Sequence, residues 1–101
     1  MSYKIVIQNL AKEDFRRANS FYKETLVKGL SKRFAQEIKF TITNKIARYP
    51  TAFAIRYRNV RIDHTHKFPF AIHFLVDELN KIIYIIAIIH SRRSSEKMQT
   101  R

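Results

Sequence analysis

The chain has 101 residues, of which 46% are hydrophobic and 13% aromatic; this composition fits one folded domain and excludes a disordered chain. It contains no cysteine, which excludes disulfides and thiolate metal sites. Its 20 Lys and Arg residues against 8 Asp and Glu give a formal net charge of +12, more than solubility requires. This excess indicates a polyanionic partner such as RNA, DNA or an acidic protein, although a basic surface without a dedicated partner stays an alternative.

The N-terminal half predicts a strand and two helices. Residues 3–10 alternate in polarity like a strand, and from Ala11 apolar residues recur every three or four positions, with Asn9 as a candidate N-cap. The only glycine, Gly29, stands where a turn between helices needs a positive φ. A second helical period follows and ends before Pro50. The apolar positions of the two helices are Phe15, Ala18, Tyr22 and Leu26, then Leu30, Phe34, Ile38, Ile42 and Ile46.

The C-terminal half returns to a period of two. Residues 54–57 and 60–67 form a first β segment with a break near Arg58-Asn59, followed by strands over residues 68–76 and 82–90 around a polar loop. The order β-α-α-β-β-β predicts an α+β fold, a helical hairpin packed on one face of a mainly antiparallel sheet. We expect one domain over residues 1–95 and a flexible basic tail over residues 96–101. The longest apolar run, residues 82–89, is too short to cross a bilayer, and no signal peptide is visible, so a cytoplasmic protein is expected.

The last strand is apolar on both of its faces, which a sheet with one wet face does not require. If Val76 pairs with Ile82, then Phe70, Ile72 and Phe74 lie opposite Ile88, Ile86 and Tyr84 beneath the helices. Two helices cannot cover both faces, so the second face is either covered by the chain's own loops and tail or open as a groove for another chain. The predicted groove residues are His73, Leu75, Ile83, Ile85 and Ile89.

Basic residues concentrate in the first β segment and at the C-terminus. They converge on one edge if these segments come close, and Arg suits that role because its planar fork binds phosphate or carboxylate. The predicted basic edge comprises Arg56, Arg58, Arg61, Lys67, Arg92 and Arg93. His90 stands next to this set and could move protons near neutral pH. His64 and His66 alone do not make a metal site, and no cofactor motif is present, so neither a metal nor a cofactor is predicted.

Several segments of this chain resemble the RelE/ParE family of toxins, over nearly the whole length. They are Phe68-Pro69-Phe70-Ala71-Ile72-His73-Phe74, the strand end Ile89-His90-Ser91-Arg92-Arg93, the pair Ala18 and Tyr22, Gly29-Leu30, Arg33-Phe34 with Glu37, and Pro50 followed by Val60-Arg61. The resemblance implies a type II toxin–antitoxin system in which a cognate antitoxin wraps and neutralises the toxin. The apolar groove residues would then bind the antitoxin, and the basic edge would face the target.

The family implies two mechanisms. RelE-like members cut mRNA in the ribosome with clustered basic groups; ParE-like members share the fold, lack those groups and inhibit DNA gyrase. Here Ala71 stands where many nucleases keep an arginine, and Asp63 replaces the second basic residue of a strand pair. The sequence therefore favours a non-enzymatic gyrase inhibitor. The alternatives are an mRNA endonuclease using Arg61, His90, Arg92 and Arg93, and a member that has lost toxicity or binds nucleic acid in another way.

Overall fold

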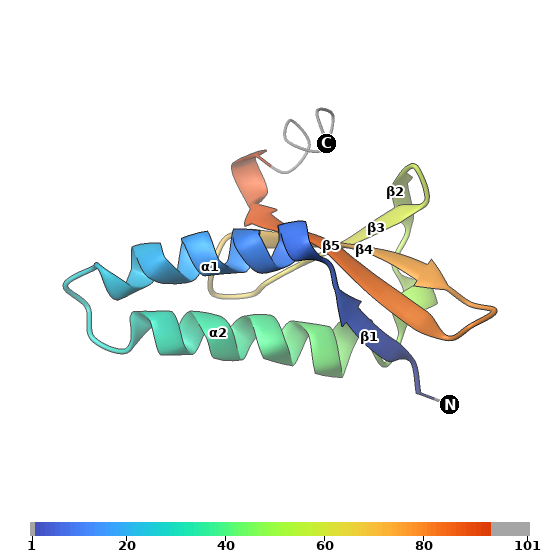
Figure 1. Ribbon diagram of the computed structural model, residues 1–101, viewed down its shortest axis with the longest axis horizontal. Coiled ribbons are helices and arrows are strands. Elements are labelled where there is room, and N and C mark those ends of the chain that lie inside the picture. The colour runs from blue at the N-terminus through green and yellow to red at the C-terminus, as the bar shows by residue number, and fades with distance from the viewer. Residues whose placement is uncertain (1, 94–101) are drawn as a thin grey trace.

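The computed structural model describes residues 2–93 and has the α+β architecture expected from the sequence. Two antiparallel helices lie side by side across one face of a five-stranded sheet (Figure 1). The sheet order is β1-β5-β4-β3-β2, with β1 parallel to β5 and every other pair antiparallel. The elements are β1 (Lys4–Ile7), α1 (Asn9–Lys23), α2 (Leu30–Phe40), β2 (Ile55–Tyr57), β3 (Val60–His64), β4 (Phe70–Asp77) and β5 (Ile82–His90). Among residues 2–93 no helix is long and apolar enough to cross a membrane.

The helix ends differ locally from the predicted ones. α1 ends at Lys23, so the prediction that Leu26 lies on its apolar face is wrong: Leu26 follows the helix and is exposed. Gln8 rather than Asn9 is the N-cap of α1. Gly29 has the expected positive φ, 77°, as the residue before α2. The second helical period continues beyond α2 as a π-helical stretch, η1 (Thr41–Ile46), in which the Ala47 N–H donates to the Ile42 carbonyl at 2.8 Å. This stretch keeps Ile42 and Ile46 buried against the sheet, so the apolar period ends at Pro50 as predicted.

The predicted break near Arg58-Asn59 is a complete hairpin, so the first β segment is two strands. Tyr57 and Val60 pair across the turn, and both turn residues have positive φ, 39° and 65°. Two consecutive positive values are typical of the type I′ turn that joins twisted strands. The order is therefore β-α-α-β-β-β-β, and the additional edge strand is β2.

The register between β4 and β5 differs from the expected one. Asp77, not Val76, pairs with Ile82, because the Asp77 carboxylate accepts hydrogen bonds from Asn80 N (3.0 Å) and Nδ2 (2.9 Å) and starts the loop one residue later. The same bonds hold the pKa of this carboxyl below its usual value. Lys81 closes the loop with a φ of 56°. A one-residue shift exchanges the faces of a strand, so Ile83 and Ile85 point toward the helices.

A β-bulge in β5 then reverses the alternation again. Phe74 pairs with Ile85 and His73 with Ala87, which leaves Ile86 as the extra residue. After the bulge, Ile88 returns to the helix-covered face, where the buried core holds Phe34, Phe70, Ile72, Phe74, Ile83, Ile85 and Ile88. The prediction that Ile86 belongs to this core is wrong: it lies partly buried against Ala87 and Ile89 on the opposite face.

One helix residue satisfies a backbone donor of β5 just beyond the bulge. The buried Asp14 carboxylate, on α1, accepts a 3.0 Å hydrogen bond from the Ile88 N–H. We predict that Asp14→Ala leaves this buried donor without its carboxylate acceptor and lowers the free energy of unfolding by about 2 kcal/mol, whereas Asp14→Asn, which keeps an acceptor oxygen, loses less. Urea unfolding followed by circular dichroism measures both changes. The neighbouring Glu13→Ala is the control, expected within about 0.5 kcal/mol of the parent; an equal loss for Glu13→Ala and Asp14→Ala contradicts the assignment.

Candidate functional site

The C-terminal end of β5 holds His90 in a fixed orientation. Its Nδ1 accepts a 3.2 Å hydrogen bond from the Arg92 backbone N–H, and its ring lies edge-on to Phe70 with centroids 5.6 Å apart. An Nδ1 that accepts a hydrogen bond leaves the proton of the neutral ring on Nε2. His90 is thus half-buried and tied to the strand end.

Arg61 does not join His90. Its Nη1 donates to the carbonyls of Phe53 (2.7 Å) and Thr51 (3.2 Å), so the guanidinium anchors the segment that leads into β2. Arg61 pairs with Phe74, whereas His90 pairs with Phe70. Four residues along β4 separate these positions by roughly 13 Å. The four residues predicted for a nuclease, Arg61, His90, Arg92 and Arg93, therefore do not form one cluster.

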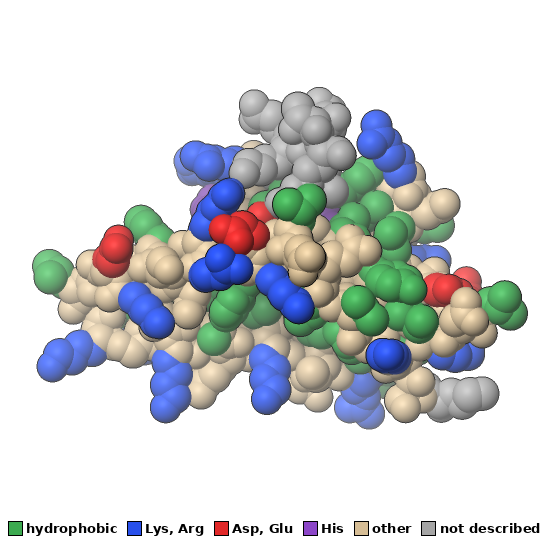
Figure 2. All heavy atoms as spheres, viewed as in Figure 1, with side chains coloured by type: hydrophobic (Ala, Val, Ile, Leu, Met, Phe, Trp, Pro, Cys, Tyr) green, Lys and Arg blue, Asp and Glu red, His purple; other side chains and the backbone are tan. Residues whose placement is uncertain are grey.

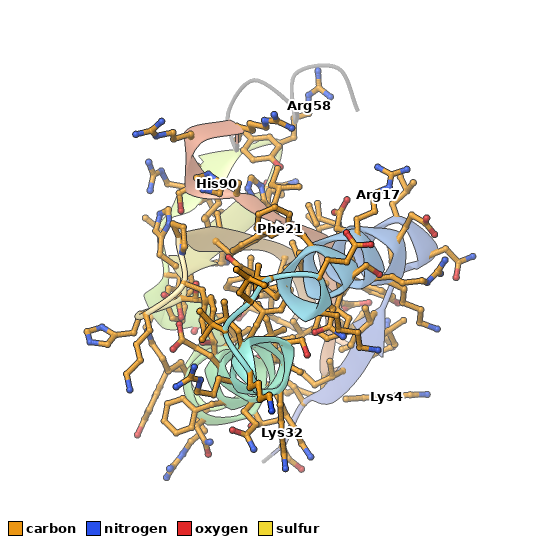
Figure 3. The ribbon with its side chains drawn as sticks, turned by 90° about the vertical axis from the view of Figure 1, so that its left-hand side faces the viewer. Lys4, Arg17, Phe21, Lys32, Arg58 and His90 are labelled. Atoms are coloured by element: carbon orange, nitrogen blue, oxygen red, sulfur yellow. The ribbon has the colours of Figure 1, made fainter. Side chains whose placement is uncertain are left out.

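The predicted basic edge is divided in the same way. Arg56 and Arg58 belong to the β2–β3 hairpin, whereas Lys67, Arg92 and Arg93 lie near the other end of β4, where Ser91 N donates to Pro69 O at 2.8 Å. The expectation that they converge is wrong because β4 separates β3 from β5. Cationic side chains are scattered over the visible face of the molecule (Figure 2), and Lys4, Arg17, Lys32 and Arg58 point in different directions (Figure 3). Their role toward a target stays a prediction.

The face expected to bind an antitoxin is also changed by the register. Ile83 and Ile85 are fully buried beneath the helices, so the prediction that they share an open groove with His73, Leu75 and Ile89 is wrong. On the opposite face His73 and Ile89 are buried, and Leu75 is half-buried. The Tyr57 hydroxyl lies 2.7 Å from His73 Nδ1, so β2 contributes to closing this face.

An open apolar groove lies on the helical side instead. It has a volume of about 340 Å³, and in Figure 2 hydrophobic side chains gather where β1 meets the helices. Its walls come from β1, α1 and α2, with Ile5, Ile7, Phe15, Ile38 and Ile42 as the main apolar contributors and Lys12 and Lys39 as cations. Because β1 is an edge strand, Ile7 keeps 36% of its surface exposed. Sequence reasoning missed this groove, although the run Ile5-Val6-Ile7 is apolar at consecutive positions and so exceeds what one buried face needs.

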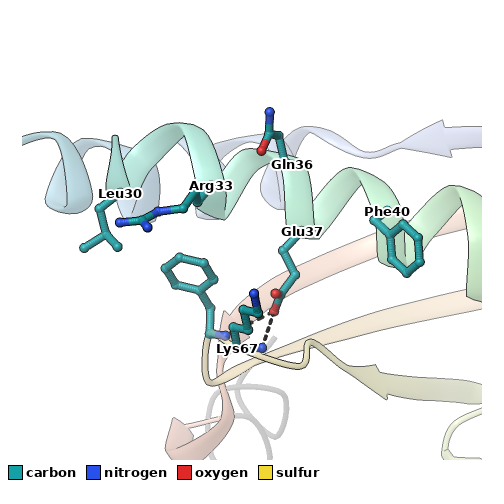
Figure 4. A pocket seen from close by; sticks show the side chains of 7 residues that line it. Leu30, Arg33, Gln36, Glu37, Phe40 and Lys67 are labelled. Atoms are coloured by element: carbon teal, nitrogen blue, oxygen red, sulfur yellow. Dashed lines mark hydrogen bonds between the residues drawn. The ribbon is translucent and has the colours of Figure 1, made fainter. Parts of the chain in front are cut away.

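A second, more polar hollow of about 680 Å³ lies between α2 and the loop joining β3 to β4. Figure 4 shows Leu30, Arg33 and Phe40 along α2 and Lys67 on the facing loop. The Glu37 carboxylate crosses the hollow and accepts hydrogen bonds from the backbone N–H groups of Lys67 (2.6 Å) and Phe68 (3.1 Å). This carboxylate therefore holds the loop at a fixed distance from the helix.

The described part of the chain has no cluster of side chains suited to bind a metal ion. Residues 2–93 contain no group of three or more His, Asp or Glu side chains arranged to hold a metal ion. His64 lies near Ser91 rather than another His, with 3.5 Å between Nδ1 and Oγ. A smaller hollow of about 230 Å³ brings His90 and Arg93 together with Arg17 and Asp14.

Comparison with known proteins gives a consistent family. Residues 5–95 match the family model described as the ParE toxin of the type II toxin–antitoxin system parDE. A search of the curated proteins finds no significant match. Among solved structures, the chain is similar to one from the chromosomal ParDE system of P. aeruginosa, with a TM-score of 0.73 and 19% identity over 87% of this chain and 95% of that one.

Two RelE-type structures are also similar. One belongs to the toxin–antitoxin complex RelBE2 of Mycobacterium tuberculosis, with a TM-score of 0.60 and 13% identity, covering 89% of this chain and 99% of that one. The other is a mutant of the E. coli toxin RelE in the free state, with a TM-score of 0.58 and 12% identity, covering 98% of this chain and 93% of that one. These likenesses confirm the expected fold.

The loop anchor at Glu37 can be tested directly. We predict that Glu37→Ala costs about 1–2 kcal/mol, since hydrogen bonds to a charged group contribute somewhat more than neutral ones and this carboxylate is only half-buried. Amide exchange of Lys67 and Phe68 should accelerate in Glu37→Ala and stay at the parental rate in the exposed Gln36→Ala. If the two amides exchange equally in both variants, the carboxylate does not hold the loop.

Proposed function

The chain belongs to the ParE toxin family of type II toxin–antitoxin systems, and we propose that it acts by inhibiting DNA gyrase rather than by cutting mRNA. The observation that carries the choice is the separation of Arg61 from His90 by roughly 13 Å along β4. A nuclease must place its proton-transfer group and its phosphate-binding groups around one scissile bond, within hydrogen-bond reach. Arg61 instead donates to two loop carbonyls. Action on gyrase also implies a cytoplasmic protein.

The remaining basic residues support contact with a target surface rather than a reaction. Arg92 and Arg93 are exposed at the end of β5, and Arg56 and Arg58 are exposed on the hairpin. Exposed charges spread over a face steer association with an acidic partner, and they need no mutual alignment. This arrangement fits a protein that works by binding.

We predict that the purified chain inhibits DNA supercoiling by purified gyrase and leaves mRNA intact in a ribosome-dependent cleavage assay. Both assays use the same preparation, with the antitoxin complex as the negative control, because neutralisation should remove the activity. Transcript cleavage in the ribosome assay together with normal supercoiling would contradict the proposal and favour the RelE-like alternative.

Neutralisation is proposed to use the apolar groove between β1, α1 and α2. A structural neighbour of this chain comes from a ParDE system, and another from a toxin–antitoxin complex. The groove has the composition that an amphipathic antitoxin segment needs: an apolar floor, with Lys12 and Lys39 at its margin for acidic residues of the partner. This location replaces the one expected from the sequence, since Ile83 and Ile85 lie in the core.

We expect Ile7→Asp to abolish neutralisation without unfolding the toxin, because this side chain lies at the exposed rim of the groove. Leu79→Asp is the matched control: it changes an equally apolar residue that is 91% exposed in the β4–β5 loop. Co-purification with the antitoxin and growth rescue measure the effect, and thermal melting checks the fold. Full rescue of the Ile7→Asp toxin would place the antitoxin elsewhere.

A further inference from the structure

We propose that the hollow between α2 and the β3–β4 loop binds a short segment of single-stranded DNA. Its walls combine two exposed cations, Arg33 and Lys67, with the aromatic side chains Phe40 and Phe68. Cations that follow a phosphate backbone and rings on which bases stack are the two elements of single-strand binding sites. The choice of DNA as the strand rests on the proposed action on gyrase.

The shape of the hollow suits a strand better than an isolated ion. Leu30 and Phe40 lie ten residues apart on the helical segment, which corresponds to roughly 15 Å along α2. The volume of about 680 Å³ is twice that of the apolar groove on the other side of the helix pair. Figure 4 shows Arg33 and Phe40 at different positions along this length, with the loop that carries Lys67 on the other side of the hollow.

The electrostatics of the hollow favour an anion despite the presence of Glu37. Both backbone donors of the loop, Lys67 N and Phe68 N, point at this carboxylate and offset its charge locally. Within residues 2–93 neither Arg33 nor Lys67 forms a side-chain ion pair, unlike Arg16, Arg17 and Lys45. Two cations thus remain available to phosphates, and His66 beside them is exposed.

Of the two aromatic side chains in the hollow, Phe68 is held in a fixed position, as a ring that supports a stacked base must be. Phe68 packs edge-on against Tyr22 (5.1 Å between centroids) and Phe34 (5.4 Å), so its position is fixed by the core. Thr65 fixes the same loop from inside: its hydroxyl donates to the Phe68 carbonyl, and its N–H donates to Phe70 O at 2.9 Å. Phe40, in contrast, keeps 56% of its surface exposed at the end of α2 and is available for stacking. A prearranged site of this kind binds without first ordering a loop.

The apolar groove assigned to the antitoxin differs from this hollow. That groove is almost entirely aliphatic, apart from Phe15 and cations at its margin, and it opens at β1. The hollow opens on the opposite side of α2, toward the β3–β4 loop. The toxin could therefore hold a protein segment and a nucleic-acid strand on two different sides of the same helix.

The test measures binding of a fluorescent single-stranded 12-mer of DNA to the purified full chain by anisotropy across a salt series. We expect Arg33→Ala/Lys67→Ala to weaken binding roughly tenfold and to reduce the salt slope by about 1.4, at ~0.7 per phosphate contact on a single strand. The matched control removes two exposed cations elsewhere, Lys4→Ala/Arg16→Ala, and should change affinity less than about threefold. If both double variants lose affinity equally, binding is spread over the whole basic surface and the proposal fails.

The stacking contribution has its own control. Phe40→Ala should weaken binding at least about fivefold, the lower end of what base–aromatic stacking contributes, whereas Phe21→Ala, which removes an equally large and 64% exposed ring at the far end of α1, should not. Equal affinity for a DNA duplex of the same sequence would overturn the assignment of a single strand. Tighter binding of a single-stranded RNA 12-mer of the same sequence would overturn the choice of DNA. Thermal melting of each variant confirms that the fold is kept.

The experiment also separates this proposal from the proposed function. If the chain inhibits gyrase but does not bind DNA at the hollow, the DNA site is wrong and the proposal of gyrase as the target is unaffected. Conversely, if DNA binding depends on Arg33, Lys67 and Phe40 but the chain does not inhibit gyrase, the proposal of gyrase as the target is wrong. Loss of gyrase association by Arg33→Ala/Lys67→Ala with unchanged DNA binding would show that the hollow receives protein, which also overturns the proposal.

Discussion

The hydrogen bond from the Ile88 N–H to the Asp14 carboxylate is the contact on which the arrangement of this fold depends. β5 carries apolar side chains at nearly every position, so hydrophobicity alone does not determine which of them face the helices. The bulge at Ile86 determines it, because Ile83 and Ile85 before it and Ile88 after it lie on one face although their spacing breaks the alternation. Just beyond this bulge the Ile88 N–H is buried, and a buried N–H without an acceptor is costly. Asp14 supplies the acceptor and connects α1 to the central strand.

The same two helices then create different surfaces on their two sides. Toward β1 they leave an aliphatic groove, since the edge strand is too short to fill the space between α1 and α2. Toward the β3–β4 loop they meet the cluster of Tyr22, Phe34 and Phe68, whose rings pack within 5.0–5.4 Å of each other. Glu37 holds that side at a fixed width. One helix pair therefore offers an apolar groove on one side and a cationic aromatic hollow on the other, which are the sites proposed for the antitoxin and for DNA.

The sequence predicted what depends on periodicity and missed what depends on pairing. The helical hairpin, its apolar positions Phe34 and Ile38, and the positive φ of Gly29 follow from local patterns and are confirmed. The faces of Ile83, Ile85 and Ile86 could not be predicted, since an Asx-type turn at Asp77 and a bulge at Ile86 both shift the register. Arg61 was predicted to be a phosphate-binding residue, yet its partners are carbonyls of a loop that periodicity cannot place.

The acidic residues are few and do not neutralise the Lys and Arg side chains, which leaves the net charge of +12. Asp14, Glu37 and Asp77 accept hydrogen bonds mainly from backbone N–H groups, and Asp63 also accepts from His64 N at 2.8 Å. Ion pairs join Glu13 to Arg16 and Arg17, and Asp63 to Lys45. Asp63 also pairs with Lys45, but the 8 acidic residues of the chain are too few to neutralise its 20 Lys and Arg side chains. The excess of cations over acids thus supports the proposed contact with an anionic partner, because complementary charge steers association.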